Sequence, residues 1–215
     1  MNLKGIKANF LGDSITEGVG ASAHEKVYHQ LIAKNYGLAE ARNYGISGTR
    51  FAKQIKPTVD NPRFDLDFCG RFGEMDDDAE LIVVFGGTND FGHGDAPFGT
   101  PTDRTSETFC GACHALMKGL IEKYPDSTIV IMTPLHRETE SQPSAGNALP
   151  LSDYVEVIKK TAEFYSLPVI DLWSISGIQP RVDVIKKKYS PDGLHPNDAG
   201  HEKMAERIGN FLLAL

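Results

Sequence analysis

The sequence predicts an α/β protein, a three-layer α/β/α sandwich built on a five-stranded parallel sheet. Short apolar runs alternate with longer amphipathic stretches along the whole chain, which is the pattern of parallel strands joined by helical crossovers. Residues 81–85 are apolar at every position, as expected for a central strand that is covered on both faces. A length of 215 residues without a repeat or linker fits one α/β unit, so we expect a single domain over residues 1–215.

Five strands are predicted from short runs of apolar and β-branched residues, most of them bounded by turn-forming residues. They lie at residues 6–11, 41–46, 81–85, 128–132 and 168–172. The second of these runs is the weakest, because it contains the fewest apolar residues. The third ends at Gly86 and Gly87, which mark the turn that follows it.

Helices are predicted where apolar side chains recur every three to four positions. They lie at residues 28–36, 105–124, 152–165 and 198–215. Gly37 suits the left-handed C-cap of the first helix, and Pro125 closes the second. Ser152 or Asp153 is expected to be the N-cap of the third.

Three connections are long for this fold, namely residues 51–78, 91–104 and 134–150. Long ordered loops often form the walls or lids of functional sites. We therefore expect these segments to surround the site of this protein.

The charge balance excludes several classes of protein. With 22 Lys and Arg against 29 Asp and Glu, the formal net charge is −7. The basic run at 186–188 is too short to form the positive stripe that neutralises nucleic-acid phosphates, so no nucleic-acid partner is expected. The longest apolar run, at 81–85, is far shorter than the roughly 20 residues that span a bilayer. Residues 1–5 lack the apolar stretch of a secretory signal, which leads us to expect a cytoplasmic protein.

The three cysteines, Cys69, Cys110 and Cys113, cannot all pair with one another, so no disulfide framework is expected. Residues 110–114 match the haem-attachment pattern C-x-x-C-H, and C-x-x-C alone can be a redox pair. Neither interpretation fits the context, because Cys113 lies on an apolar stripe of helical spacing and no strand immediately precedes it. Cys113 is expected in the core, with His114 turned away from the stripe.

Short segments rich in glycine and polar residues follow the first three predicted strands, at the point where each strand ends. Ser14 follows the first strand, Gly48 the second and Asn89 the third, and Asp192 and His195 stand just before the closing helix. Each segment alone is ordinary turn chemistry. Open α/β sheets bind ligands at the carboxyl ends of their strands, so we expect these segments to form one site.

In this combination the sequence resembles the SGNH hydrolases, also called GDSL-type esterases and lipases. Residues 12–15, Gly-Asp-Ser-Ile, stand where that family has Gly-Asp-Ser-Leu. Residues 87–90 match its G-x-N-D block and residues 192–195 its D-x-x-H block. The glycine of the second block maps best to Gly48, with Gly45 as the alternative. The resemblance implies the flavodoxin-like fold of the family, with its five-stranded parallel sheet.

The chemistry of these residues supports the roles that the resemblance implies. A serine hydroxyl is a weak nucleophile at neutral pH, so it needs a base within hydrogen-bond reach and a third group that orients the base. We expect Ser14 to be the nucleophile, His195 the base and Asp192 the orienting carboxylate. The backbone N–H groups of Ser14 and Gly48 and the side-chain amide of Asn89 would form the oxyanion hole.

Other residues near these blocks receive supporting or undecided roles. Asp13 and Thr16 are expected to hold the turn around Ser14. Trp173, after the fifth strand, is expected to be buried against the final helix, with contact to a sugar or an acyl chain as the alternative. Three residues close to Asn89 either line the pocket or lie on a solvent-exposed loop: Phe91, His93 and Asp95.

The leading hypothesis is a serine esterase that hydrolyses a small O-acyl ester through an acyl-enzyme. Residues 92–104 and 138–147 are polar and rich in Gly, Asp and Thr, which favours an acetyl ester of a carbohydrate over a long-chain lipid. A lysophospholipase, lipase or acyl-thioesterase is an alternative, and a non-catalytic ligand-binding module is one of another class. The net charge favours a neutral ester. No cofactor or metal is expected, because the histidines lack ligand spacing such as H-E-x-x-H.

Overall fold

The computed structural model describes residues 1–143 and 146–215 and contains one parallel sheet with the strand order β2-β1-β3-β4-β5. The strands are β1 (Lys7–Gly12), β2 (Glu40–Gly45), β3 (Leu81–Phe85), β4 (Thr128–Met132) and β5 (Val169–Ile170). The predicted fold class is confirmed. Gly12 pairs in register with Gly45 on one side and Phe85 on the other. The first three strands therefore end level, and the turns that follow them share one edge of the sheet.

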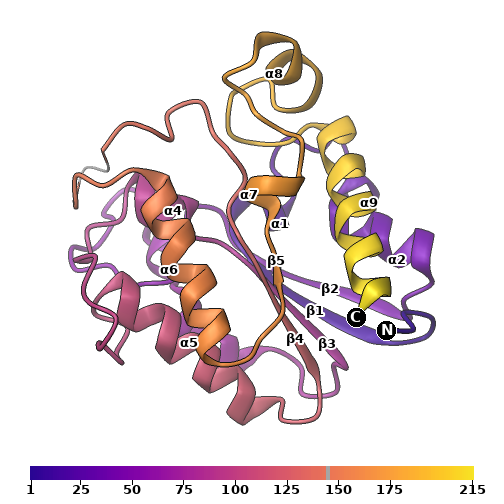
Figure 1. Cartoon of the computed structure of the whole chain (residues 1–215), viewed down its shortest axis with the longest axis horizontal. Helices are drawn as coiled ribbons and strands as arrows, with labels where there is room; N and C mark the ends of the chain where they lie inside the picture. Colours follow the sequence, from indigo (N-terminus) through magenta and orange to yellow (C-terminus); the bar gives the residue numbers. More distant parts are fainter. Residues whose placement is uncertain (144–145) are drawn as a thin grey trace.

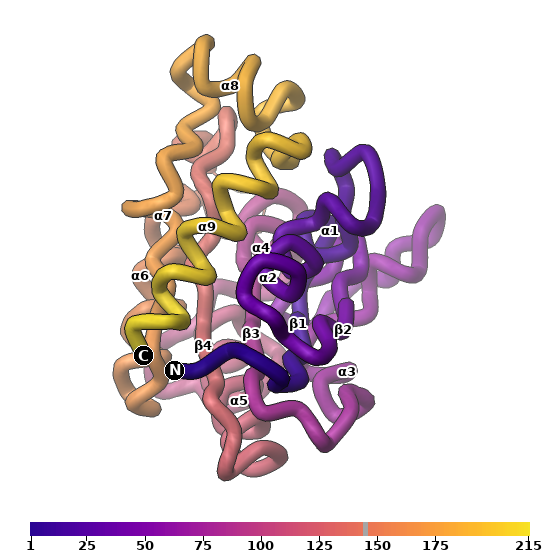
Figure 2. Tube along the Cα trace, turned by 90° about the vertical axis from the view of Figure 1, so that its right-hand side faces the viewer, coloured from indigo at the N-terminus to yellow at the C-terminus, as the bar shows by residue number. Residues whose placement is uncertain are grey.

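Two layers of helices enclose the sheet (Figure 1). Helices α5 (Phe109–Lys123) and α6 (Leu151–Phe164) cover one face, and α2 (Tyr28–Tyr36) and α9 (Asp198–Ala214) cover the other. The amino group of Met1 donates to the carbonyl of Leu212 (3.0 Å), so the two ends of the chain meet beside α9 (Figure 2). Within the described ranges, no helix is both long and apolar enough to cross a membrane.

Within residues 1–143 and 146–215 there are also five shorter α-helices. They are α1 (Ser14–Glu17), α3 (Phe68–Arg71), α4 (Thr88–Gly92), α7 (Leu172–Ile175) and α8 (Asp183–Tyr189). The sequence analysis identified none of them as helices, because four or five residues are too few to establish an apolar period and α8 has no buried residue. Helices α1 and α4 directly follow β1 and β3, so they begin at the edge of the sheet where ligands are expected.

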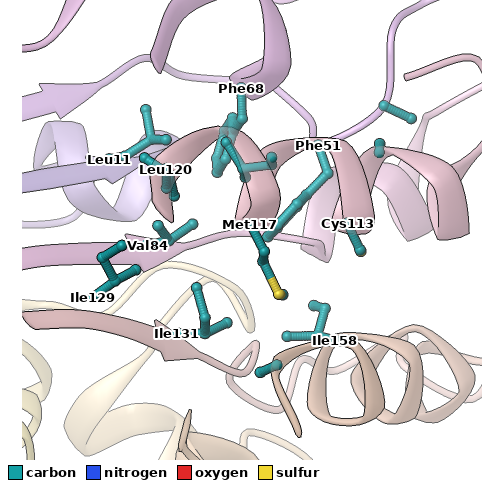
Figure 3. Packing of buried hydrophobic residues seen from close by; sticks show 14 of the residues in the cluster. Leu11, Phe51, Phe68, Val84, Cys113, Met117, Leu120, Ile129, Ile131 and Ile158 are labelled. Atoms are coloured by element: carbon teal, nitrogen blue, oxygen red, sulfur yellow. The ribbon is translucent and has the colours of Figure 1, made fainter. Parts of the chain in front are cut away.

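Successive side chains of the central strands enter opposite cores. In β3, Leu81, Val83 and Phe85 enter the core under α2 and α9. Ile82 and Val84 enter the core under α5 and α6. In the core under α5 and α6, Met117 of α5 and Ile158 of α6 gather beside the strand residue Ile131 (Figure 3). A strand that is apolar at every position is therefore what this two-sided sheet requires.

Helix α5 begins later than predicted. It starts at Phe109, not at residue 105, because the Thr108 hydroxyl accepts a hydrogen bond from the N–H of Gly111 (3.1 Å) and caps the helix there. Residues 105–108 belong to the preceding turn. A side-chain oxygen that satisfies a free N–H of the first turn is a common signal for a helix start.

The expected capping of α6 by Ser152 or Asp153 is wrong. The helix begins at Leu151, its N-cap position is Pro150, and no side chain caps it. Proline fits here because its ring fixes φ and it has no N–H to satisfy.

The C-x-x-C-H segment lies inside α5, and the predicted core position of Cys113 is confirmed. Burial raises the pKa of Cys113 well above its ordinary value, so the thiol stays protonated. His114 is also buried, with Nδ1 3.3 Å from the Tyr165 hydroxyl. Cys113 and His114 are therefore structural residues of α5 that pack against their neighbours.

The expected burial of Trp173 against the final helix is wrong. Leu172 enters the core under α9, whereas Trp173 is half-buried on the side of α5 and α6. The centroid of a Trp173 ring lies 3.8 Å from that of His136. Strand β5 ends after two residues and α7 begins at once, which turns the indole to the other side of the sheet.

Candidate active site

Ser14 is the first residue of α1, at the tight turn that follows β1. The carboxylate of Asp13 accepts a hydrogen bond from the N–H of Ile15 (3.0 Å) and caps the helix. Thr16 shares a hydrogen bond with the buried hydroxyl of Tyr28 (3.0 Å). Asp13 therefore supports the turn as expected, whereas the side chain of Thr16 joins α1 to Tyr28 of α2. Burial raises the pKa of Asp13 to about 6.

The structure brings Ser14, His195 and Asp192 together from opposite ends of the chain. Ser14 Oγ lies 2.9 Å from His195 Nε2, and His195 Nδ1 lies 2.7 Å from Asp192 Oδ2. The other carboxylate oxygen accepts the N–H groups of Leu194 (2.9 Å) and His195 (2.7 Å). Burial raises the pKa of Asp192, but these hydrogen bonds outweigh it and the net shift is downward. One carboxylate thus fixes both the turn and the ring, with Nε2 of the ring facing the Ser14 hydroxyl.

Neighbouring loops hold the His195 turn in place. Gly20 has φ +94°, and a Cβ at this position would lie 2.3 Å from the carbonyl oxygen of Pro196. From the other side, the N–H of Glu138 donates to the carbonyl of Gly193 (2.8 Å). Neither support could be predicted from the sequence. A glycine in a polar loop has no periodic signal, and neither has a backbone contact between distant loops.

The Asn89 side chain and the Gly48 turn lie against each other. Asn89 Nδ2 donates to the carbonyl of Thr49 (3.0 Å), which leaves its second hydrogen free of partners among the described residues. The N–H of Gly48 likewise has no acceptor there. The N–H of Gly45 differs, because it already donates to the side-chain oxygen of Asn43 (2.8 Å). The arrangement presents unused donors at Gly48 and Asn89 and none at Gly45.

Asp90 connects two of the sequence blocks. Its buried carboxylate accepts the N–H groups of Phe51 and Ala52, both at 3.0 Å. Burial raises the pKa of Asp90 to about 6. The contact fixes the chain just after the Gly48 turn relative to α4, which carries Asn89. The sequence includes Asp90 as the last residue of the block at 87–90, but it gives no indication of this contact.

Arg71 is a further support that could not be predicted from the sequence. The guanidinium is buried and donates to the carbonyls of Gly12 (2.6 Å) and Tyr44 and to the Thr49 hydroxyl (3.1 Å). Burial lowers the pKa of Arg71 to about 10. It joins the ends of β1 and β2 to the Gly48 turn from a segment that was expected to be a loop.

The three residues close to Asn89 have separate environments. Phe91 is largely buried in the core, and it also lines a small cavity beside Arg137. The Asp95 carboxylate accepts the N–H groups of Ile55 and Lys56 on the surface. His93 is exposed, and its Nδ1 lies 2.9 Å from a guanidinium nitrogen of Arg50.

Replacing Gly48 by alanine is expected to destabilise the protein by about 2 kcal/mol. A non-glycine residue at positive φ costs roughly 1–2 kcal/mol, and Gly48 has φ +76° with a built Cβ 2.3 Å from the Phe64 ring. The free energy of unfolding in urea measures the effect. Gly73→Ala is the matched control, since a Cβ there meets nothing within 4 Å. Equal stability of the two variants would contradict the expectation.

The comparisons with known proteins agree with this geometry. The model of the GDSL-like lipase/acylhydrolase family matches residues 10–203. A GDSL lipase of Mycobacterium tuberculosis is 25% identical over 94% of this chain and 79% of its own length.

Two solved structures illustrate the likeness of fold. A protein of Lactobacillus plantarum is 29% identical, covers 98% of each chain and has a TM-score of 0.85. An acetyl xylan esterase, AlAXEase, is 23% identical over 96% of this chain and 100% of its own, with a TM-score of 0.63. The match to the family model covers most of the chain, from β1 into α9. The chain therefore belongs to the GDSL-like lipase/acylhydrolase family and is a hydrolase that acts on carboxylic esters.

Proposed function

We propose that the protein is a serine esterase that removes small acyl groups, above all acetyl groups, from the hydroxyls of a carbohydrate. The observation that carries the proposal is the hydrogen-bonded series from Ser14 through His195 to Asp192, at 2.9 and 2.7 Å. These are the distances at which a base can take the proton of a nucleophile as it attacks.

The reaction would proceed in two steps. Ser14 Oγ bonds to the ester carbonyl carbon while its proton moves to His195 Nε2. The bond between that carbon and the alcohol oxygen then breaks, and His195 gives its proton to the departing oxygen. In the second step water loses a proton to His195 and its oxygen bonds to the acyl carbon. The bond between that carbon and Ser14 Oγ then breaks, Oγ takes the proton from His195, and the acid is released. Asp192 keeps the ring oriented and stabilises its positive charge.

Three donors support stabilisation of the tetrahedral intermediate. Ser14 opens α1, so its N–H has no intrahelical acceptor. The N–H of Gly48 and the second hydrogen of Asn89 Nδ2 are also without acceptors among the described residues. Donors already oriented for the developing negative charge lower the barrier most effectively. The occupied N–H of Gly45 favours Gly48 as the glycine of this set.

The loops beside the site support a short acyl group. Residues 92–104 and 138–147 are polar and rich in Gly, Asp and Thr, whereas a tunnel for a long acyl chain would need a contiguous apolar lining. The acetyl xylan esterase with the same fold agrees with this choice of acyl group.

A series of p-nitrophenyl esters from acetate to laurate tests the proposal. We expect kcat/KM for acetate to exceed that for laurate by at least about 10-fold, because each unaccommodated part of a chain costs binding energy in the transition state. A preference for laurate would indicate a lipase or lysophospholipase instead. Absence of turnover with every ester would favour a ligand-binding module.

A further inference from the structure

Arg137 lies in the connection between β4 and α6 with only part of its guanidinium paired. Its Nη1 donates to the carbonyl (3.1 Å) and the hydroxyl (3.2 Å) of Thr88. Its Nε is buried and has no partner, and Nη2 has none among the described residues. No carboxylate within residues 1–143 and 146–215 forms an ion pair with the Arg137 guanidinium. Arg71 differs, because Nε, Nη1 and Nη2 all have acceptors.

Arg137 is connected to the Ser14 site through its hydrogen-bond partner Thr88. Its partner Thr88 directly precedes Asn89 and lines the small cavity beside the Ser14 turn together with Asp13 and Leu194. Burial lowers the pKa of Arg137, and the nearby charges of Asp13 and Asp192 partly offset this effect. The guanidinium is therefore close enough to interact with the same group of residues that surrounds the nucleophile.

A separate cavity adjoins the guanidinium. It has a volume of about 80 Å³ and is lined by Arg137 with Phe91, Gly92, Thr139, Gln142 and Pro143. The guanidinium carbon lies 5.3 Å from the centroid of the Phe91 ring, and a Cβ at Gly92 would come within 2.7 Å of Nη1. The side chain is thus held between an aromatic face and a glycine, with space for a small polar group beside it.

A half-buried arginine without a directly paired counter-ion is unfavourable, because burial removes water from the charge and the neutral acceptors of Thr88 and the more distant carboxylates of Asp13 and Asp192 replace it only in part. With Nη1 held by Thr88, the free edge of the guanidinium is formed by Nε and Nη2. Two parallel N–H groups on one edge match the two oxygens of a carboxylate, and this bidentate arrangement is the strongest that arginine makes. A carboxylate is therefore the group that best complements Arg137.

We propose that Arg137 binds a carboxylate on the alcohol side of the ester, so that the substrates are O-acyl esters of acidic carbohydrates. The inference rests on the proposed esterase function and makes it more specific. It departs from the neutral ester that the net charge of −7 favoured. Net charge sets the long-range field around the protein, whereas one oriented guanidinium decides which group is accepted at the site.

Two matched esters test the inference, 4-acetoxybenzoate and its neutral analogue 4-acetoxybenzamide. They share the acyl group and the shape of the alcohol, and they differ in the charge at the far end. We expect kcat/KM to be about 10-fold higher for the anion, a typical effect of one oriented charge pair. In Arg137→Gln this ratio should fall close to one, and Arg137→Lys should retain part of it.

Arg104→Gln is the control, because it removes the same charge from an arginine that stacks on Phe164 and donates to the carbonyls of Pro101 and Asp103. Its ratio should equal that of the unchanged protein. A loss of folded protein or of support for Thr88 lowers both rates together and leaves the ratio intact. An unaltered ratio in Arg137→Gln, with Ser14-dependent turnover of both esters, would overturn the inference alone. Absence of turnover of both esters by the unchanged protein would instead contradict the esterase function.

Discussion

Ser14→Ala is expected to lower kcat for p-nitrophenyl acetate by at least about 10⁴-fold, because the acyl-enzyme cannot form and only the oxyanion donors remain to assist water. Within the described residues, the hydrogen bond to His195 is the only one that the Ser14 hydroxyl makes. The variant should therefore keep the stability of the unchanged protein, and steady-state kinetics alongside urea unfolding measure both properties.

The matched control is Ser152→Ala, since Ser152 lies on α6 with only a long contact of 3.4 Å to Asp153. Its kcat should equal that of the unchanged protein. Full activity of Ser14→Ala would show that another residue attacks the ester.

Asn89→Ala is expected to reduce kcat by roughly 10²-fold with little change in KM. A preset donor to the oxyanion acts mainly in the transition state, and its removal typically costs a factor of about 10² to 10³. The hydrogen bond from Nδ2 to Thr49 is also lost, which should lower the free energy of unfolding by only about 1 kcal/mol. Kinetics with p-nitrophenyl acetate and urea unfolding separate the two effects.

The control for Asn89 is Asn35→Ala, an exposed position on α2. It should have normal kinetics. If Asn89→Ala raised KM and left kcat unchanged, the amide would contribute to substrate binding and not to the oxyanion hole.

The sheet and the principal helices could be predicted from the sequence because their apolar periods are long enough to be distinctive. Residues 81–85 identify a strand covered on two faces, and the structure confirms it as β3. The segments around Ser14, Asn89 and His195 could be placed at one edge of the sheet for a related reason. Each stands beside a recognisable element, and parallel strands end on the same side.

The supports of the site could not be predicted in the same way. Asp90 accepts N–H groups of the chain that follows the Gly48 turn, and Arg71 donates to the Thr49 hydroxyl and to the carbonyls at the ends of β1 and β2. Such contacts depend on the path of the long connections, which have no period. Arg137 is a further example, because its missing counter-ion is visible only once the surrounding carboxylates are placed. The net charge of the chain gave no indication of it.

Mass spectrometry after treatment with a fluorophosphonate tests the role of Ser14 most directly. The reagent traps an activated serine by bonding phosphorus to its oxygen and releasing fluoride. We expect one phosphonyl group on the peptide that contains Ser14, in proportion to the loss of esterase activity, and no adduct in Ser14→Ala. Inactivation accompanied by an adduct on a different residue, with Ser14 unmodified, would contradict the assignment of Ser14 as the nucleophile.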